Sequence, residues 1–369
     1  MGTFGKIVGA VSVVTGAAGA VAASGVTAQR RAVRRYRELA ASPDIHYDTL
    51  TADRTYSVAS ADGLALHVEE VGPTAAPLTV IFAHGWTLRL GAWHYQRIAL
   101  SGNGFGTGSG PEARLVFFDQ RSHGRSGRAD PGRSTVTAVS EDLAAVIATA
   151  APTGPLVIVG HSLGGMALLG LAETDPALFY ERVVGYALMD SSARYGSEKG
   201  SRPPLLGGNP VVRAVTATAS RYPRLFERGR PATREAVWLL TRSFGFADPD
   251  VPTHLVDYVD EMISSVPVDV IADFIPAIIG HDVRAGVRVL ADLPGLILCG
   301  EADRITPPVQ SWALAEALPD AELLIVAGAG HNVMLENPQV VNAALQKLLQ
   351  LAGIRAGLAG IDDPDGVVT

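Results

Sequence analysis

The chain has 369 residues, 47% of them hydrophobic and 18% charged, which is enough for one large core with an insertion. Its formal net charge of −7 argues against nucleic acid as a partner. Cys299 is the single cysteine, so an internal disulfide framework is excluded, and its apolar neighbours predict a buried core residue.

The N-terminal segment differs from the rest of the chain. Residues 7–28 carry no charge, are rich in Gly, Ala and Val, and precede an Arg-rich run at 30–37. The stretch is long enough to cross a bilayer as a helix. Its basic flank follows it, which favours a membrane anchor with the rest of the chain in the cytoplasm over a secretory signal peptide. We expect residues 1–45 to form a separate segment that associates with a membrane through residues 7–28. A helix packed on the domain remains an alternative, and a cytoplasmic or secreted location stays open.

Strands and helices are predicted to alternate along the next part of the chain. Apolar, β-branched runs predict strands, and apolar residues at helical spacing predict helices. The expected strands are 56–60, 64–71, 79–83, 114–118, 156–160, 183–189, 295–299 and 321–326, and the expected helices are 93–100, 136–150, 166–172, 308–318 and 338–351. This alternation predicts an α/β fold with a doubly wound, mainly parallel sheet and helices on both faces.

The strand pattern stops between positions 190 and 296. Residues 193–285 contain several prolines and are helical in places, at 234–241 and 254–265, and they are too long for a loop. We interpret them as a mostly helical lid whose apolar residues line a substrate cavity in part. The lid is inserted into an α/β core of residues 46–192 and 286–355, and we expect a flexible tail at 356–369.

The ten residues from Leu156 to Gly165, LVIVGHSLGG, contain the pattern G-x-S-x-G between a predicted strand and a predicted helix. Such a tight turn needs a strained backbone at Ser162, which the small neighbours Gly160 and Gly164 permit. The turn places the hydroxyl above the sheet at a helix N-terminus, which favours a developing negative charge. The stretch is therefore a predicted nucleophile elbow, with Ser162 as the nucleophile.

A serine nucleophile needs a base within hydrogen-bond reach, and the base needs an acid to orient it. Of the three downstream histidines, only His331 lies outside the insertion, in a Gly-rich loop after the last predicted strand. Asp303 follows the strand at 295–299 and is the predicted acid. Glu301 is the local competitor, and Asp190, at the end of the preceding strand, is the distant one.

Acyl transfer places negative charge on an oxygen, so two backbone N–H donors are needed. We expect the N–H groups of Leu163, directly after the nucleophile, and of Trp86, in the loop after strand 79–83, to form this oxyanion hole. His84 and His161 lie nearby, but we interpret both as structural. The charged turn at 119–125 could hold a metal or an anion, and the simpler interpretation is a salt-bridged turn that braces the elbow.

These motifs resemble those of α/β-hydrolase fold enzymes with an inserted lid, a group of esterases, lipases, cofactor-free haloperoxidase-like perhydrolases and meta-cleavage C–C hydrolases. The resemblance covers about residues 50–352 and is carried by His84-Gly85-Trp86, residues 119–126, residues 160–165, residues 300–303 and Gly330-His331. Epoxide hydrolases and haloalkane dehalogenases on this scaffold carry Asp at the nucleophile position, so Ser162 argues against both. Residues 1–45 and the Gly-rich stretch 101–110 depart from the usual pattern.

We therefore expect a serine carboxylic-ester hydrolase that acts through an acyl-enzyme on a small-molecule acyl ester, and a lipase-like preference for lipid-like substrates. No metal or organic cofactor is required for this chemistry. Two alternatives use the same triad: a C–C bond hydrolase of the meta-cleavage type and a cofactor-free perhydrolase. An alternative of another class is a non-catalytic binding protein on this fold.

Overall fold

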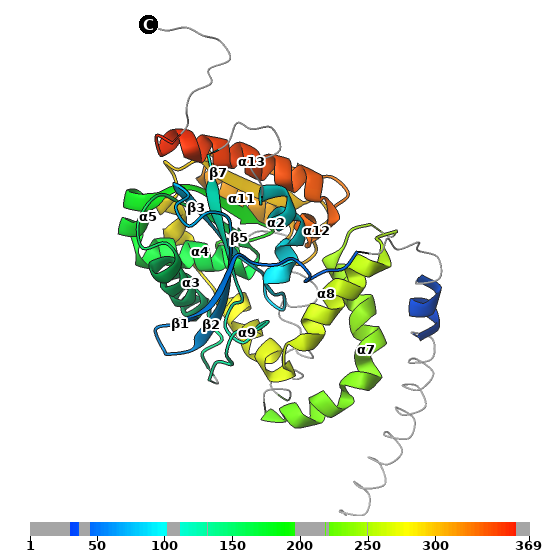
Figure 1. The fold of residues 1–369 in the computed structure, drawn as a ribbon. Helices are drawn as coiled ribbons and strands as arrows, with labels where there is room; N and C mark the ends of the chain where they lie inside the picture. Colours follow the sequence, from blue (N-terminus) through cyan, green and yellow to red (C-terminus); the bar gives the residue numbers. More distant parts are fainter. Residues whose placement is uncertain are drawn as a thin grey trace, which may run out of the picture.

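The core of this computed structural model is an eight-stranded sheet (Figure 1). The structure describes residues 30–36, 45–101, 111–130, 132–195, 218, 221–248 and 250–358. The strands are β1 Arg54–Ala59, β2 Ala65–Val71, β3 Leu78–Ala83, β4 Ala113–Phe118, β5 Leu156–His161, β6 Val183–Met189, β7 Gly295–Gly300 and β8 Glu322–Val326. They lie in the order β1-β2-β4-β3-β5-β6-β7-β8. β2 pairs antiparallel with β1 and β4, and every other neighbouring pair is parallel.

Helices cover both faces of this sheet. The described helices are the 3-10 helix η1 Leu90–Trp93, α2 His94–Leu100, α3 Val136–Ala150, α4 Leu163–Thr174, α5 Pro176–Arg182, α7 Pro223–Gly245, α8 Thr253–Ser265, α9 Val268–Gly280, α10 Arg284–Val289, α11 Pro308–Ala317, α12 Val333–Glu336 and α13 Pro338–Arg355. α3, α4 and α11 pack on one face, and α2 and α13 pack on the other.

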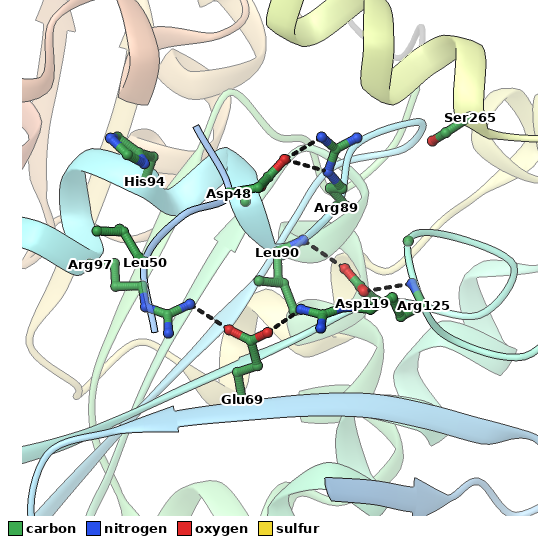
Figure 2. Close-up of a pocket in the computed structure, with 12 residues that line it drawn as sticks. Asp48, Leu50, Glu69, Arg89, Leu90, His94, Arg97, Asp119, Arg125 and Ser265 are labelled. Carbon is green, nitrogen blue, oxygen red and sulfur yellow. Dashed lines mark hydrogen bonds and ion pairs between the residues drawn. The ribbon is translucent and has the colours of Figure 1, made fainter. Parts of the chain in front are cut away.

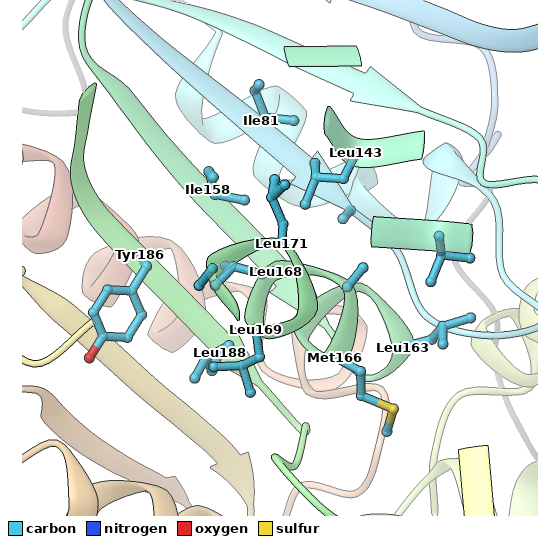
Figure 3. Close-up of a cluster of buried hydrophobic side chains, with 14 of the residues drawn as sticks. Ile81, Leu143, Ile158, Leu163, Met166, Leu168, Leu169, Leu171, Tyr186 and Leu188 are labelled. Carbon is cyan, nitrogen blue, oxygen red and sulfur yellow. The ribbon is translucent and has the colours of Figure 1, made fainter. Parts of the chain in front are cut away.

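The central strands are buried on both faces because their side chains alternate between two apolar clusters. In β3, Ile81 belongs to the cluster under α3 and α4, whereas Phe82 belongs to the cluster under α2 and α13. Figure 3 shows the first cluster, in which Leu143 of α3, Ile158 of β5 and Leu171 of α4 lie together. This double burial explains why β3 and β5 appear in the sequence as continuous apolar runs.

The predicted doubly wound, mainly parallel sheet is confirmed. The expected helix 136–150 and the expected strand 183–189 have the bounds of α3 and β6, and the other expected strands shift at their ends by one or two residues. The sequence did not predict α5, α9, α10 or α12. α9 was missed because it contains many β-branched residues and has Pro276 inside the helix, and both lower the helix propensity of the isolated segment.

Between β6 and β7 the described residues are largely helical. α7 contacts both α8 and α9, and α10 returns to the core and packs on α4. Figure 1 shows α7, α8 and α9 beyond one end of the sheet. None of the described helices is long and apolar enough to cross a membrane alone, and α8 and α9 pass that test only as a pair bent by 95°.

The Arg-rich flank of the N-terminal segment is partly described. Residues 30–36 form a helix beside α7, in which Arg30 Nε lies 3.3 Å from Glu235 Oε1. The Tyr36 ring lies 6.0 Å from that of Trp238, and the Arg242 guanidinium lies 4.0 Å from the Tyr36 ring centre. The predicted anchor at 7–28, the Gly-rich residues 102–110 and residues 359–369 of the predicted tail lie outside the described residues.

Candidate active site

Ser162 occupies the sharp turn between β5 and α4. Its backbone has φ 51° and ψ −114°, a conformation that side-chain-bearing residues rarely adopt. The flanking glycines make the turn possible, since a Cβ on Gly164 would clash with the carbonyl of Ala83 and one on Gly160 would lie 2.6 Å from the Gly164 backbone. The Ser162 N–H donates to the Met189 carbonyl at 2.9 Å, which holds the turn against β6.

Three predicted side chains from separate loops form one hydrogen-bonded chain. Ser162 Oγ lies 3.1 Å from His331 Nε2, and His331 Nδ1 lies 2.8 Å from Asp303 Oδ2. With Nδ1–H donating to the carboxylate, Nε2 is the acceptor for the serine hydroxyl. The three residues follow β5, β7 and β8, so all lie at the carboxyl ends of parallel strands. Ser162 and His331 are each 7% exposed, so the site is nearly closed to solvent.

The Asp303 carboxylate is held by its own loop. Its Oδ1 accepts hydrogen bonds from the N–H groups of Ile305 at 2.7 Å and Thr306 at 3.0 Å. The Thr306 hydroxyl lies 2.7 Å from both Asp303 Oδ2 and the Asp190 carbonyl oxygen, and 3.3 Å from His331 Nδ1. The sequence analysis missed Thr306, although an Asp followed three residues later by Thr is a pattern typical of a side-chain-capped turn.

Neither competing acid hydrogen-bonds to His331. Glu301 is exposed, and its Oε2 accepts a hydrogen bond from the Gly328 N–H at 3.3 Å. Asp190 is fully buried, and its Oδ1 accepts a hydrogen bond from the Gly300 N–H at 2.9 Å. Burial, together with the nearby Asp303 charge, raises the pKa of Asp190 well above its usual range. This shift favours the neutral form of Asp190, which is less suited to orient His331 than Asp303 is.

Asp190, Asp303 and Cys299 each offer one potential metal-ligand atom, and these three atoms lie within 4.8 Å of one another. Asp303 is already engaged by His331 and its own loop. Burial also raises the pKa of the Cys299 thiol. With Asp303 engaged, Asp190 and Cys299 leave two donors, fewer than the three or four protein ligands of a usual metal site.

The predicted oxyanion donors come from two segments next to Ser162. Leu163 begins α4, and Trp86 follows Gly85 in the loop after β3. A Cβ on Gly85 would lie 3.2 Å from the Ser162 Cβ, so this loop passes directly over the nucleophile. Among the described residues, neither the Leu163 nor the Trp86 N–H donates to an acceptor within the chain. Both donors are thus available to a ligand.

Buried histidines support the loop that carries Trp86. His84 Nδ1 donates to the Gly85 carbonyl at 2.8 Å, and its Nε2 accepts from the Gln120 N–H at 3.0 Å. His123 Nε2 accepts from the N–H of Thr87, which has a positive φ of 65°. Burial lowers the pKa of His84 to about 3 and that of His123 to about 4. Both rings are therefore neutral and structural.

The charged turn after β4 also supports the site rather than forming one. The Asp119 carboxylate accepts the N–H groups of Leu90 at 2.7 Å and Arg125 at 2.8 Å. A cavity of about 330 Å³ lies beside this turn. Figure 2 shows its lining residues, among which Glu69 pairs with both Arg97 and Arg125. Its charged side chains pair with one another, and Ser162 does not line it.

The insertion reaches the His331 loop through a residue that the sequence analysis missed. Glu336, at the end of α12, accepts hydrogen bonds from Gly330 N–H at 2.8 Å and from Ala247 N–H at 2.9 Å. Gly330 precedes His331, and Ala247 follows α7. No sequence pattern indicated this contact, because it joins segments more than 80 residues apart along the chain.

Comparisons with known proteins agree with this architecture. The sequence model of the Alpha/beta hydrolase family matches residues 80–344. The pimeloyl-[acyl-carrier protein] methyl ester esterase of Xanthomonas oryzae pv. oryzae is 26% identical over 294 residues, covering 77% of this chain and 98% of the esterase.

Solved structures share the fold at lower identity. A thermophilic esterase from Thermogutta terrifontis superposes with a TM-score of 0.62 at 24% identity, covering 81% of this chain and 99% of that one. A bromoperoxidase from Bacillus anthracis superposes with a TM-score of 0.63 at 18% identity, covering 80% of this chain and 100% of the bromoperoxidase chain. The family match spans most of the sheet and all three residues of the hydrogen-bonded chain. The chain belongs to the alpha/beta hydrolase family.

Proposed function

We propose that this protein is a serine hydrolase that cleaves a small-molecule carboxylic ester through an acyl-enzyme. The observation that carries the proposal is the hydrogen-bonded chain from Ser162 through His331 to Asp303 at a strained elbow. The similarity to the Xanthomonas oryzae methyl ester esterase supports an ester as the substrate class.

The proposed mechanism uses only this chain's own groups and water. Ser162 Oγ attacks the ester carbonyl carbon while His331 Nε2 takes the hydroxyl proton. Asp303 stabilises the imidazolium, and the N–H groups of Leu163 and Trp86 bind the oxyanion. The ester C–O bond then breaks, and the alcohol leaves with the proton from Nε2. Water then attacks the acyl-enzyme carbonyl carbon while His331 takes its proton. The bond from this carbon to Ser162 Oγ breaks, the proton on His331 returns to Oγ, and the carboxylic acid leaves.

The surroundings of the nucleophile support an apolar acyl group. Leu163 belongs to the same apolar cluster as Phe274 and Ile278 of α9, and Trp86 packs against it. We propose that residues 193–285 act as a lid over Ser162, whose burial requires a path for substrate entry. A series of p-nitrophenyl esters of increasing acyl length tests whether the site prefers an apolar acyl group. A preference for acetyl over longer esters would contradict that preference.

Replacement of the nucleophile tests the main proposal. We expect Ser162→Ala to lower p-nitrophenyl ester hydrolysis by about three orders of magnitude or more and to abolish labelling by a fluorophosphonate probe. Ser140→Ala is a matched control, because its buried hydroxyl donates to the Val136 carbonyl in its own helix, α3. Unchanged turnover in Ser162→Ala, or a wild-type protein that the probe does not label, would exclude the proposed function.

We also propose that residues 7–28 attach the protein to a membrane and leave the catalytic domain in the cytoplasm. The support is the uncharged stretch followed by arginines in the sequence. Cell fractionation of the full chain and of a chain without residues 1–29 tests the attachment. Equal recovery of the two proteins in the supernatant would exclude it.

A further inference from the structure

One short segment of the insertion is joined to both loops that carry the His331–Asp303 pair. Asn332 donates its backbone N–H and its Nδ2 to the Gly245 carbonyl, at 3.1 and 2.9 Å. Arg304, next to Asp303, donates Nη1 to the Ser243 carbonyl at 3.0 Å. The end of α7 therefore contacts the residue after the base and the residue after the acid.

Glu336 completes this junction on the other side of His331. Its two carboxylate oxygens accept one N–H each, from Gly330 and from Ala247, at 2.8 and 2.9 Å. The two backbone segments are in close contact, since a Cβ on Gly330 would lie 2.7 Å from the Ala247 nitrogen. The loop of His331 is thus attached to the insertion both before and after the imidazole.

The Glu336 contact differs from the others in its chemistry. Asn332 and Arg304 donate to carbonyls, and these bonds persist throughout the neutral pH range. A carboxylate accepts two N–H groups equally well, but a protonated carboxyl presents one weakened acceptor. Its protonation therefore loosens one of the two segments.

The surroundings of Glu336 shift its pKa toward neutral pH. Burial, as the largest effect, raises the pKa of Glu336 to about 7, although its two N–H donors act in the opposite direction. The charged groups that interact with it are Asp303, which raises its pKa, and His331, which lowers it, while the buried Asp190 is itself affected by Glu336.

We propose that Glu336 is a positioning residue, which in its carboxylate form holds His331 against Ser162 by joining the base loop to the end of α7. The inference rests on the proposed function, and it adds a coupling between the insertion and the base. Displacement of residues 245–247 with the insertion would pull on the backbone on both sides of His331. Glu336 itself does not touch substrate.

The test compares Glu336→Gln with wild type in the pH dependence of kcat/KM. A glutamine oxygen accepts only one N–H, so the variant mimics the protonated form. We expect the variant to be about tenfold slower near pH 9, which corresponds to the loss of one hydrogen bond, and to approach wild type near pH 5. The ratio of the wild-type rate to the variant rate should therefore fall from about ten near pH 9 to about one near pH 5. A rate ratio that stays constant across this pH range indicates a purely structural role and would overturn the proposal.

Glu301→Gln is the matched control, because Glu301 also accepts an N–H of the same loop, from Gly328, but is exposed. We expect its pH profile to coincide with that of wild type. Amide hydrogen exchange gives a readout that does not depend on activity. Gly330 or Ala247 should lose protection in Glu336→Gln, and unchanged protection of both would overturn the proposal. If wild type hydrolyses no ester, the proposed function fails, and the exchange experiment still decides whether Glu336 joins the two segments.

Discussion

His161 donates its Nε2–H to the backbone carbonyl of His331 at 2.8 Å. His161, which precedes Ser162, therefore holds the backbone of His331, and the imidazole of His331 contacts the Ser162 hydroxyl. The two rings lie 4.9 Å apart, and His161 is completely buried. The distance between Ser162 Oγ and the imidazole is therefore constrained from both ends.

Loss of the His161 side chain should weaken this arrangement. In His161→Ala the His331 carbonyl loses its donor, and we expect a decrease in the free energy of unfolding of about 1–3 kcal/mol and a lower kcat. Burial lowers the pKa of His161 to about 3, so the ring is neutral at working pH and the loss should not vary between about pH 5 and pH 9. Chemical denaturation and a pH profile measure both effects, and a pH-dependent loss would contradict this interpretation.

The two buried aspartates should behave differently when each is replaced by its neutral isostere. Asp303→Asn removes the negative charge that orients His331, and we expect kcat to fall by about three to four orders of magnitude. Burial raises the pKa of Asp190, which favours its neutral form, and an asparagine oxygen can still accept the Gly300 N–H. We therefore expect Asp190→Asn to retain most of the activity. Steady-state kinetics of both variants check this, and the opposite ranking would move the acid role to Asp190.

The close approach of α4 to β3 predicts a strong effect of a single methyl group. Gly164→Ala places a Cβ against the Ala83 carbonyl, and we expect destabilisation of about 3 kcal/mol or more. Gly280→Ala is the control, since its Cβ would meet nothing within 4 Å. Its effect should be small or slightly stabilising. Urea denaturation of both variants measures the difference, and similar midpoints would contradict the packing argument.

Acid should destabilise the protein partly through Glu69. Burial acts to raise the pKa of this carboxyl, but hydrogen bonds from His67 and Arg97, with the Arg97 and Arg125 charges, lower it to about 2. The unfolded chain therefore binds this proton first, so the stabilisation is complete above the ordinary pKa of 4.5 and is lost as the pH falls toward about 2. Glu69→Gln should be less stable at neutral pH and should lose less stability across this acid window. Thermal unfolding at several pH values checks the prediction, and parallel curves for the two proteins would exclude it.

Much of the fold followed from local patterns. β3 and β5 are continuous apolar runs because both of their faces are buried, and α3 shows helical spacing because it covers the sheet on one side. The insertion was harder to predict, since α9 contains Pro276 and many β-branched residues and becomes helical in tertiary packing.

The candidate site also has one part that the sequence predicted and one part that needed the tertiary structure. The sequence by itself determined the elbow, because Gly160, Ser162 and Gly164 are neighbours and the turn's backbone geometry is a local property. It also indicated that a histidine and an acid follow late strands. Only the tertiary structure decided which acid faces His331.

The physical reason is the order of the strands. β7 and β8 are adjacent and parallel, so the loops that follow them emerge side by side, and Asp303 meets His331 while Asp190 turns to the Gly300 N–H. The contact of Glu336 with Ala247 arises in the same way, from segments that only the folded chain brings together. Periodicity in a sequence reports which side chains are buried, whereas strand order and loop packing determine which of them meet.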